Sequence, residues 1–168
     1  MNLNTLQDVF ADQIHDLQSA EQQLVQALPK MAGAASTDKL REAFENHLAE
    51  TRGHVERLNE IVATTGIGSG TETCEAMKGL IAEGEKVIKA QGDPAAKDAA
   101  LIAAAQRVEH YEIAAYGTAK TLADQLDYED ARDLLDDTLD EEANADKLLT
   151  KIATGGLIGT GVNEQARR

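Results

Sequence analysis

Four long stretches of this sequence repeat apolar residues at steps of three and four, and this pattern limits the fold more than any other feature. They cover about residues 5–31, 38–65, 94–126 and 129–154. Such spacing gathers apolar side chains on one face of an α-helix. Because a one-faced helix must bury that face against other elements, the chain is predicted to be an all-α bundle.

The connections between the four helices predict the topology. Short turns join the first helix to the second and the third to the fourth, whereas about 30 residues separate the two pairs. This long connection contains a Gly-rich run over 65–71 and a further helical pattern over about 73–90. A short–long–short order is typical of a four-helix bundle with one crossover, the ferritin-like topology, here with an extra short helix.

Local signals set the expected boundaries. Pro29 is expected to kink the first helix or to end its regular part, because proline lacks the backbone N–H and clashes with the preceding turn. Asp93 and Pro94 form a start signal for the third long helix. We expect residues 1–154 to form one helical domain and the Gly-rich residues 155–168 to form a flexible tail.

Composition excludes several functions. The chain has 30 acidic and 16 basic residues, a formal net charge of −14, which disfavours binding to nucleic acid or to anionic membranes. No apolar run approaches the roughly 20 residues of a membrane span. The N-terminal segment has no secretory signal, and the single Cys74 allows no internal disulfide, so a cytoplasmic location is expected.

Polar residues interrupt the apolar face of every long helix near its middle. A lone ionised carboxylate in an apolar core costs several kcal/mol or becomes neutral, and several together repel one another. Two divalent cations would balance four carboxylates, so the set predicts a dinuclear metal site. The candidate ligands are Glu21 in the first helix; His47, Glu50 and His54 in the second; Glu112 in the third, with Glu109 one turn before it as a ligand or an outer acid; and Glu141 in the fourth, where Asp146 or a water molecule is expected as the second ligand.

An internal repeat supports this interpretation. An offset of 91 residues places Glu21 on Glu112 and Glu50 on Glu141. Two helical hairpins related by a pseudo-two-fold axis would bring both pairs to a shared centre. The alternative stays open, because acidic residues are common in this chain and a histidine on an apolar face is often an ordinary core residue.

Several segments resemble one known family. They are DLQSAEQQLVQALPKMAGAAS, HLAETRGHVERL, CEAMKGLIAEGE, DAALIAAAQRVEHYEIAAYGTAKTLA and LLDDTLDEEANAD, within about residues 3–153. The chain is similar to the YciF/YciE proteins of enterobacteria, which are small, ferritin-like and associated with stress. The resemblance implies a homodimer and a dinuclear site with Glu21, Glu50, Glu112 and Glu141 as ligands. His47, Glu109, Glu142 and Asp146 also fall in motifs of this family.

One departure from the wider ferritin-like superfamily bears on the ligand set. Di-iron bundles present Glu-x-x-His on two helices, but Gly53 and Asn144 stand three residues after Glu50 and Glu141. His47 and His54 lie on the same side of their helix as Glu50 and are expected to substitute. A site rich in carboxylates and poor in imidazoles suits iron or manganese better than zinc or copper.

Two functions remain as alternatives, so whether the chain is an enzyme stays open. In the first, two Fe or Mn ions oxidise Fe²⁺ or remove peroxide, with O₂ or peroxide as the small substrate. In the second, the protein is a non-catalytic stress or interaction protein with a structural or vestigial metal site. Iron storage in a cage is a weaker hypothesis, and the two terminal arginines provide too little charge for coating DNA.

Overall fold

The computed structural model of this chain describes residues 3–155 and 159–167, and none of these residues lies in a β-strand. The predicted all-α fold and its four long helices are confirmed. The helices are α1 (Leu6–Ala34), α2 (Asp38–Thr65), α3 (Glu75–Lys89), α4 (Pro94–Gln125), α5 (Glu129–Thr154) and α6 (Val162–Gln165). Among the described residues, no helix has the length and the apolar character needed to cross a membrane.

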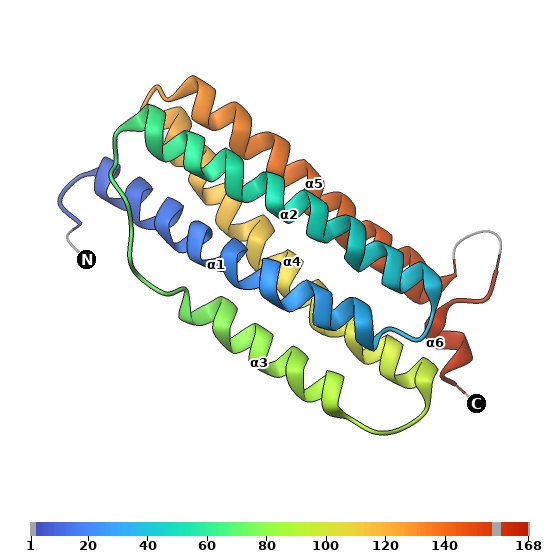
Figure 1. Cartoon of the computed structure of the whole chain (residues 1–168). Coiled ribbons are helices and arrows are strands. Elements are labelled where there is room, and N and C mark those ends of the chain that lie inside the picture. The colour runs from blue at the N-terminus through green and yellow to red at the C-terminus, as the bar shows by residue number, and fades with distance from the viewer. Residues whose placement is uncertain (1–2, 156–158, 168) are drawn as a thin grey trace.

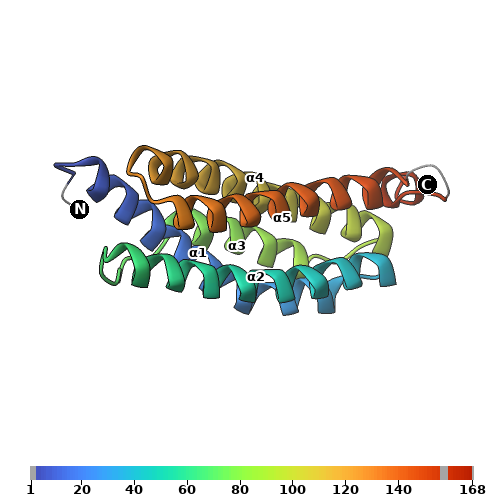
Figure 2. The same cartoon turned by 90° about the horizontal axis from the view of Figure 1, so that it is seen from above.

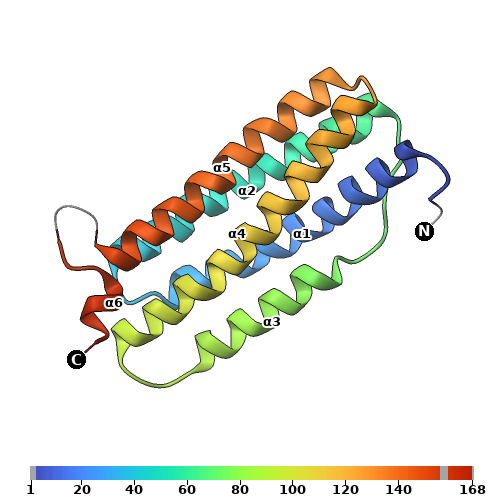
Figure 3. The same ribbon diagram turned by 180° about the vertical axis from the view of Figure 1, so that it is seen from behind.

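Two antiparallel hairpins form the bundle, α1 with α2 and α4 with α5 (Figure 1). The hairpins meet because α1 packs against α4 and α2 packs against α5, which Figure 2 shows from above. The connection from α2 to α4 carries α3, and α3 lies outside the four-helix bundle against α1 and α4 (Figure 3). This is the one-crossover arrangement of ferritin-like bundles.

Sequence signals account for most of the helix ends. Thr5 and Asp8 form a capping box at the start of α1. Asp93 accepts hydrogen bonds from two backbone N–H groups in the first turn of α4. Gly66 ends α2 in the left-handed conformation, with φ of 70°, which a residue with a side chain adopts only at a cost.

The start of α2 is held from another helix. Its N-cap residue, Thr37, makes no side-chain hydrogen bond to its own helix. Instead, the buried carboxylate of Asp98 in α4 accepts hydrogen bonds from the backbone N–H and the hydroxyl of both Ser36 and Thr37, at 2.8–3.0 Å. Asp98 therefore ties the α1–α2 turn to the second hairpin.

Two local expectations need revision. The helix α1 continues through Pro29 to Ala34, so Pro29 does not end it, and the proline lies exposed on the surface. In the tail expected over residues 155–168, residues 155 and 159–167 are described, and they include α6, whose Val162 is buried in the core. Residues 156–158 and 168 lie outside the described part of the chain.

The apolar core consists of two clusters, one in each half of the bundle. One half contains Leu24, Phe44, Leu101 and Leu149, and the other contains Phe10, Leu58, Tyr116 and Leu135. Near the middle of the bundle, all four long helices contribute buried polar side chains to the core. The fold therefore surrounds a polar layer with hydrocarbon at both ends.

Candidate metal centre

The polar layer contains six buried ionisable side chains from all four long helices. All six are at most 6% exposed. They are Glu21 on α1, His47 and His54 on α2, Glu109 and Glu112 on α4, and Glu142 on α5.

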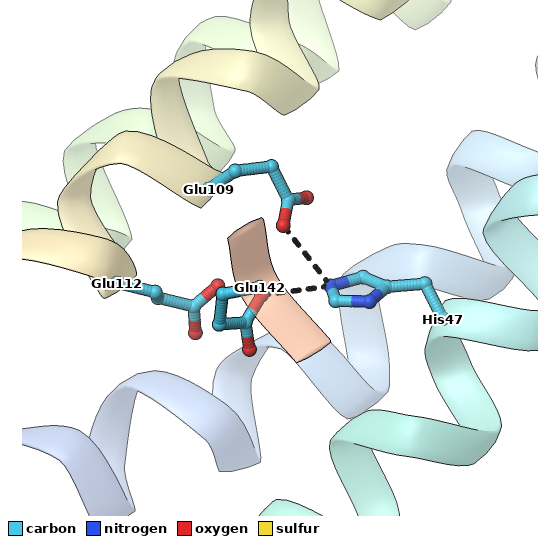
Figure 4. A group of neighbouring side chains, drawn as sticks. All are labelled: His47, Glu109, Glu112 and Glu142. Atoms are coloured by element: carbon cyan, nitrogen blue, oxygen red, sulfur yellow. Dashed lines mark ion pairs between the residues drawn. The ribbon is translucent and has the colours of Figure 1, made fainter. Parts of the chain in front are cut away.

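The first group within the layer joins three helices (Figure 4). His47, Glu109, Glu112 and Glu142 each offer one ligand atom, and these atoms lie within 4.8 Å of one another. His47 Nε2 is 3.5 Å from Glu109 Oε2 and 3.7 Å from Glu142 Oε2. One imidazole and three carboxylates thus face a common point.

The second group adjoins the first. Glu21, His54 and Glu142 also offer ligand atoms within 4.8 Å of one another. His54 Nδ1 lies 3.3 Å from Glu21 Oε1 and 3.0 Å from Glu142 Oε1. Glu142 belongs to both groups, with one oxygen toward each histidine, so this carboxylate connects them.

Most of the polar atoms in this layer have no hydrogen-bond partner in the described part of the chain. Both carboxylate oxygens of Glu112 and of Glu142 are unpartnered, as are one oxygen each of Glu21 and Glu109. His47 Nε2 and His54 Nδ1, the nitrogens that face the carboxylates, are unpartnered as well. Buried polar atoms are nearly always satisfied in folded proteins, so this concentration fits residues that hold cations.

The electrostatics of the metal-free layer lead to the same conclusion. Burial raises the pKa of Glu109 and Glu112 well above the usual range, and it also raises the pKa of Glu21. Burial opposes protonation of the two histidines, but the carboxylates around them outweigh it and raise their pKa values to about 9 for His47 and about 10 for His54. Without cations, the layer therefore retains protons, and bound cations would replace them.

A second carboxylate stands behind each histidine. Glu50 Oε2 lies 3.3 Å from His47 Nδ1, and Glu141 Oε2 lies 2.8 Å from His54 Nε2. Arg57 donates to both oxygens of Glu141, at 2.6 and 2.9 Å, and the pKa of Glu141 is lowered mainly by this hydrogen bonding. Each carboxylate orients its imidazole so that the other ring nitrogen points into the layer, an arrangement common around protein metals.

Three of the eight predicted ligands are not among the groups that the structure brings together. The Glu50 side chain is 46% exposed and that of Glu141 is 33% exposed, and both reach the layer only through a histidine. Asp146 accepts a hydrogen bond from Gln106 and lies 3.3 Å from His110 Nε2, away from the layer. The other five, Glu21, His47, His54, Glu109 and Glu112, lie within the two groups.

The predicted ligands Glu50 and Glu141 each lie one residue before the buried position of their helix. On α2 the buried position is Thr51 rather than Glu50, and on α5 it is Glu142 rather than Glu141. The α5 sequence supports two parallel stripes, because Leu134–Leu135, Glu141–Glu142 and Leu148–Leu149 recur every seven residues. Packing selects the second member of each doublet and leaves Leu148 43% exposed.

A stricter pattern would have identified Glu142. In all four helices, the inward positions alternate between steps of four and three. These positions are 10, 14, 17, 21, 24, 28 and 31; 40, 44, 47, 51, 54, 58 and 61; 101, 105, 108, 112, 115, 119 and 122; and 131, 135, 138, 142, 145, 149 and 152, all buried or partly buried. The middle residue of each series is Glu21, Thr51, Glu112 or Glu142, and the offset of 91 relates the two hairpins throughout.

This register also changes how the departure from Glu-x-x-His is understood. Three residues after Thr51 comes His54, and three residues after Glu142 comes Ala145. The second helix of the first hairpin thus keeps the histidine of that pattern and replaces the glutamate, whereas its counterpart keeps the glutamate and replaces the histidine. His47, one turn before Thr51, supplies the second imidazole of the layer.

Two tyrosines lie beside the centre and donate hydrogen bonds to carboxylates. Tyr116 donates its hydroxyl to Glu21, and Tyr111 donates to Asp16. The buried Cys74 lies at the N-terminus of α3, with its Sγ 3.0 Å from the Tyr111 hydroxyl, and burial raises its thiol pKa. A raised pKa makes a thiol less reactive, because the thiolate is the nucleophile.

Two cavities reach the same part of the layer from different sides. One, of about 160 Å³, lies between α2 and α5 and has a mixed lining, in which Asn46, Glu50 and Asn144 stand beside apolar residues such as Phe44 and Leu148. The other, of about 40 Å³, lies between α1, α3 and α4 and is lined mainly by aliphatic side chains. His47 and Glu109 line both cavities.

Comparison with known proteins places the chain among relatives that share its full length. A family model described as a domain of unknown function, DUF892, matches residues 5–166. Protein YciF of Escherichia coli (strain K12) is 49% identical over 154 residues, which cover 91% of this chain and 93% of that protein.

Solved structures agree with this assignment. The crystal structure of the E. coli stress protein YciF matches with a TM-score of 0.90 and 44% identity, covering 99% of this chain and 100% of that one. YcfI from Rhodopseudomonas palustris, described as "a putative structural protein", matches with a TM-score of 0.86 and 36% identity, covering 90% and 97% of the two chains.

Proposed function

The chain belongs to the DUF892 family, and on that premise we propose that it binds two divalent cations, Fe or Mn, and uses them to oxidise Fe²⁺ or to remove peroxide. The observation that carries this proposal is the buried layer of four carboxylates and two imidazoles whose facing atoms have no other partner. The charge of two divalent cations would balance that of the four carboxylates.

The ligands of the proposed centre fall into two sets that share Glu142. One cation would be held by His47, Glu109 and Glu112, and the other by His54 and Glu21, with Glu142 between them. Oxygen ligands outnumber nitrogen ligands, which favours iron or manganese over softer ions. Glu50 and Glu141 would act through the histidines that they orient, and Asp146 would take no part.

The proposed centre would supply redox chemistry next to a dry core. In the overall oxidation, two Fe²⁺ ions lose one electron each, and one O₂ takes up both electrons and two protons to leave as H₂O₂. Glu21 accepts a hydrogen bond from Tyr116, which holds this carboxylate in place at the edge of the layer. The hydrocarbon on both sides of the layer limits the access of water to the reaction.

Similarity to the E. coli stress protein supports a role for this chain under stress as well. Removal of Fe²⁺ or of peroxide would each limit oxidative damage. The family resemblance also leads us to propose a homodimer, which sedimentation equilibrium of the purified protein would test. A monomer at micromolar concentration would contradict that part of the proposal.

One observation favours a non-catalytic alternative. Thr51 and Ala145 occupy positions at which a symmetric centre would have a glutamate and a histidine, so the four carboxylates and two imidazoles of this layer are not placed as in a symmetric two-metal site. A structural cation in this layer would stabilise the bundle without turnover. The description of the R. palustris relative as a structural protein agrees with this alternative.

Elemental analysis and turnover measurements distinguish the two functions. The protein is purified without added metal and without an affinity tag, and its Fe, Mn and Zn contents are measured per chain. About two Fe or Mn per chain, together with Fe²⁺ oxidation or oxygen evolution from peroxide, is the expected result. A bound metal without turnover would support the structural alternative, and a metal-free protein that takes up no Fe²⁺ or Mn²⁺ would refute the proposed centre.

A further inference from the structure

The small cavity beneath α3 has an inner and an outer end of different chemistry. Its outer end lies at the exposed ion pair between Lys30 on α1 and Glu85 on α3, whose charged atoms are 2.9 Å apart. Its inner end lies at His47 and Glu109, two buried residues of the polar layer. The cavity therefore extends from the surface at α3 to the proposed metal centre.

Between these ends the walls are hydrocarbon. They include Leu24 and Leu28 of α1, Leu80 and Ile81 of α3, and Ala105 and Val108 of α4. A cavity needs roughly 10–15 Å³ to hold one water molecule, which also needs two or more polar partners to stay there. This cavity of about 40 Å³ has the room, but its middle section offers no such partners, so it suits a small apolar molecule better than water.

The inner end makes this space more than a packing defect. His47 Nε2 and Glu109 Oε2 are both unpartnered, and both residues are at least nine-tenths buried. A molecule in the cavity would thus approach two of the atoms that we assign to the first cation. Among the substrates of the proposed function, dioxygen is the one that is small and apolar.

We propose that the cavity between α1, α3 and α4 is a dioxygen-binding site and the path by which dioxygen reaches the metal centre. The delivery role rests on the proposed function, whereas gas binding in the cavity does not. The cavity of about 160 Å³ between α2 and α5 provides a contrast, because Asn46, Glu50 and Asn144 line part of it with the polar groups that cations and hydrogen peroxide require.

Two glycines of α3 provide a matched pair of variants. Gly84 lines the cavity. A Cβ atom at this position would lie 3.8 Å from Met31 Sδ, an ordinary van der Waals contact, so a larger side chain would fit there and occupy part of the cavity. Gly79 lies exposed on the same helix, and a Cβ atom added there would have no atom of another residue within 4 Å, leaving out its chain neighbours and the backbone of its own helix. Leucine is the better helix former at both sites, so neither substitution introduces a helix-breaking residue.

Xenon tests gas binding without any metal, because it enters dry apolar cavities in proteins. We expect xenon to bind the metal-free wild-type protein and Gly79→Leu, detected by ¹²⁹Xe NMR and located in xenon-pressurised crystals. Gly84→Leu should lose the xenon site. Absence of xenon from this cavity in the wild-type protein would overturn the proposal, as would an unaltered xenon site in folded Gly84→Leu.

Rates of Fe²⁺ oxidation then test delivery. Gly84→Leu should oxidise Fe²⁺ severalfold more slowly with O₂ but at an unchanged rate with H₂O₂, and Gly79→Leu should match the wild-type protein with both oxidants. An unchanged rate with O₂ in Gly84→Leu would overturn the delivery role. If the wild-type protein binds xenon but no iron, the proposed function fails while the gas site stands. Should Gly84→Leu not fold, Ile81→Phe narrows the same cavity.

Discussion

The adjacent residues Glu141 and Glu142 allow a sharp test of the metal centre. Glu142→Gln and Glu141→Gln are the same change in neighbouring positions of α5, and each preserves the shape of the side chain. Glu142 is fully buried and belongs to both groups of ligand atoms, whereas Glu141 belongs to neither and forms ion pairs with His54 and Arg57. We therefore expect Glu142→Gln to abolish binding of the second cation and to weaken binding of the first.

The expected magnitudes differ enough to measure. Loss of an outer carboxylate lowers metal affinity by about 10–100-fold, or about 1.4–2.7 kcal/mol of binding free energy. In a domain of this size, each kcal/mol corresponds to about 2–4 °C in Tm, so Glu141→Gln should lose roughly 3–11 °C of the metal-induced rise. A cation at about 1,000 times its Kd stabilises the native state by about 4 kcal/mol. Glu142→Gln should lose nearly all of the metal-induced rise in Tm.

Calorimetric melting with Mn²⁺ and with a chelator measures these shifts, and elemental analysis gives the number of ions per chain. Wild-type protein and Glu141→Gln should both retain two. Two ions per chain in Glu142→Gln, with the full rise in Tm, would refute the bridging position of this residue. Loss of an ion from Glu141→Gln alone would instead assign Glu141 as a direct ligand.

Three further predictions concern the acidic residues and the histidines. Asp98→Ala leaves the backbone N–H groups of Ser36 and Thr37 without their buried acceptor, which should cost about 2–6 kcal/mol of unfolding free energy in urea titrations; a loss below about 1 kcal/mol would contradict the proposed clamp. Glu50→Gln should weaken metal binding by about 10–100-fold without changing its stoichiometry, since Glu50 only orients His47, and a lost ion would show that it is a ligand. The pH dependence concerns the metal-free protein. The folded-state pKa values of Glu109, Glu112 and both histidines are raised, so their contribution to stability is largest at low pH and is lost as pH rises. In chelator, Tm should therefore fall from pH 6.5 toward pH 10 as the two histidines, with pKa values of about 9 and about 10, lose their protons; a flat or rising Tm over that range would contradict the assigned charges.

The sequence by itself determined the helices, their order and most of the centre. Steps of three and four predict α1, α2, α4 and α5 because the α-helix has 3.6 residues per turn. The lengths of the connections then determine which helices pair, since a turn of a few residues can join only antiparallel neighbours. Buried charge made Glu21, His47, His54 and Glu112 conspicuous, because a carboxylate or imidazole on an apolar face needs a partner.

Tertiary packing decided the rest. Leu134–Leu135, Glu141–Glu142 and Leu148–Leu149 offer α5 two faces about 100° apart, and no local property of the helix distinguishes them. Contacts with α2 and α4 turn Glu142 inward, and the Arg57 guanidinium holds Glu141 at the edge. The cavity beneath α3 likewise exists only because a helix from the crossover packs against α1 and α4. Such choices depend on the shapes of neighbouring surfaces, which a single helix does not encode.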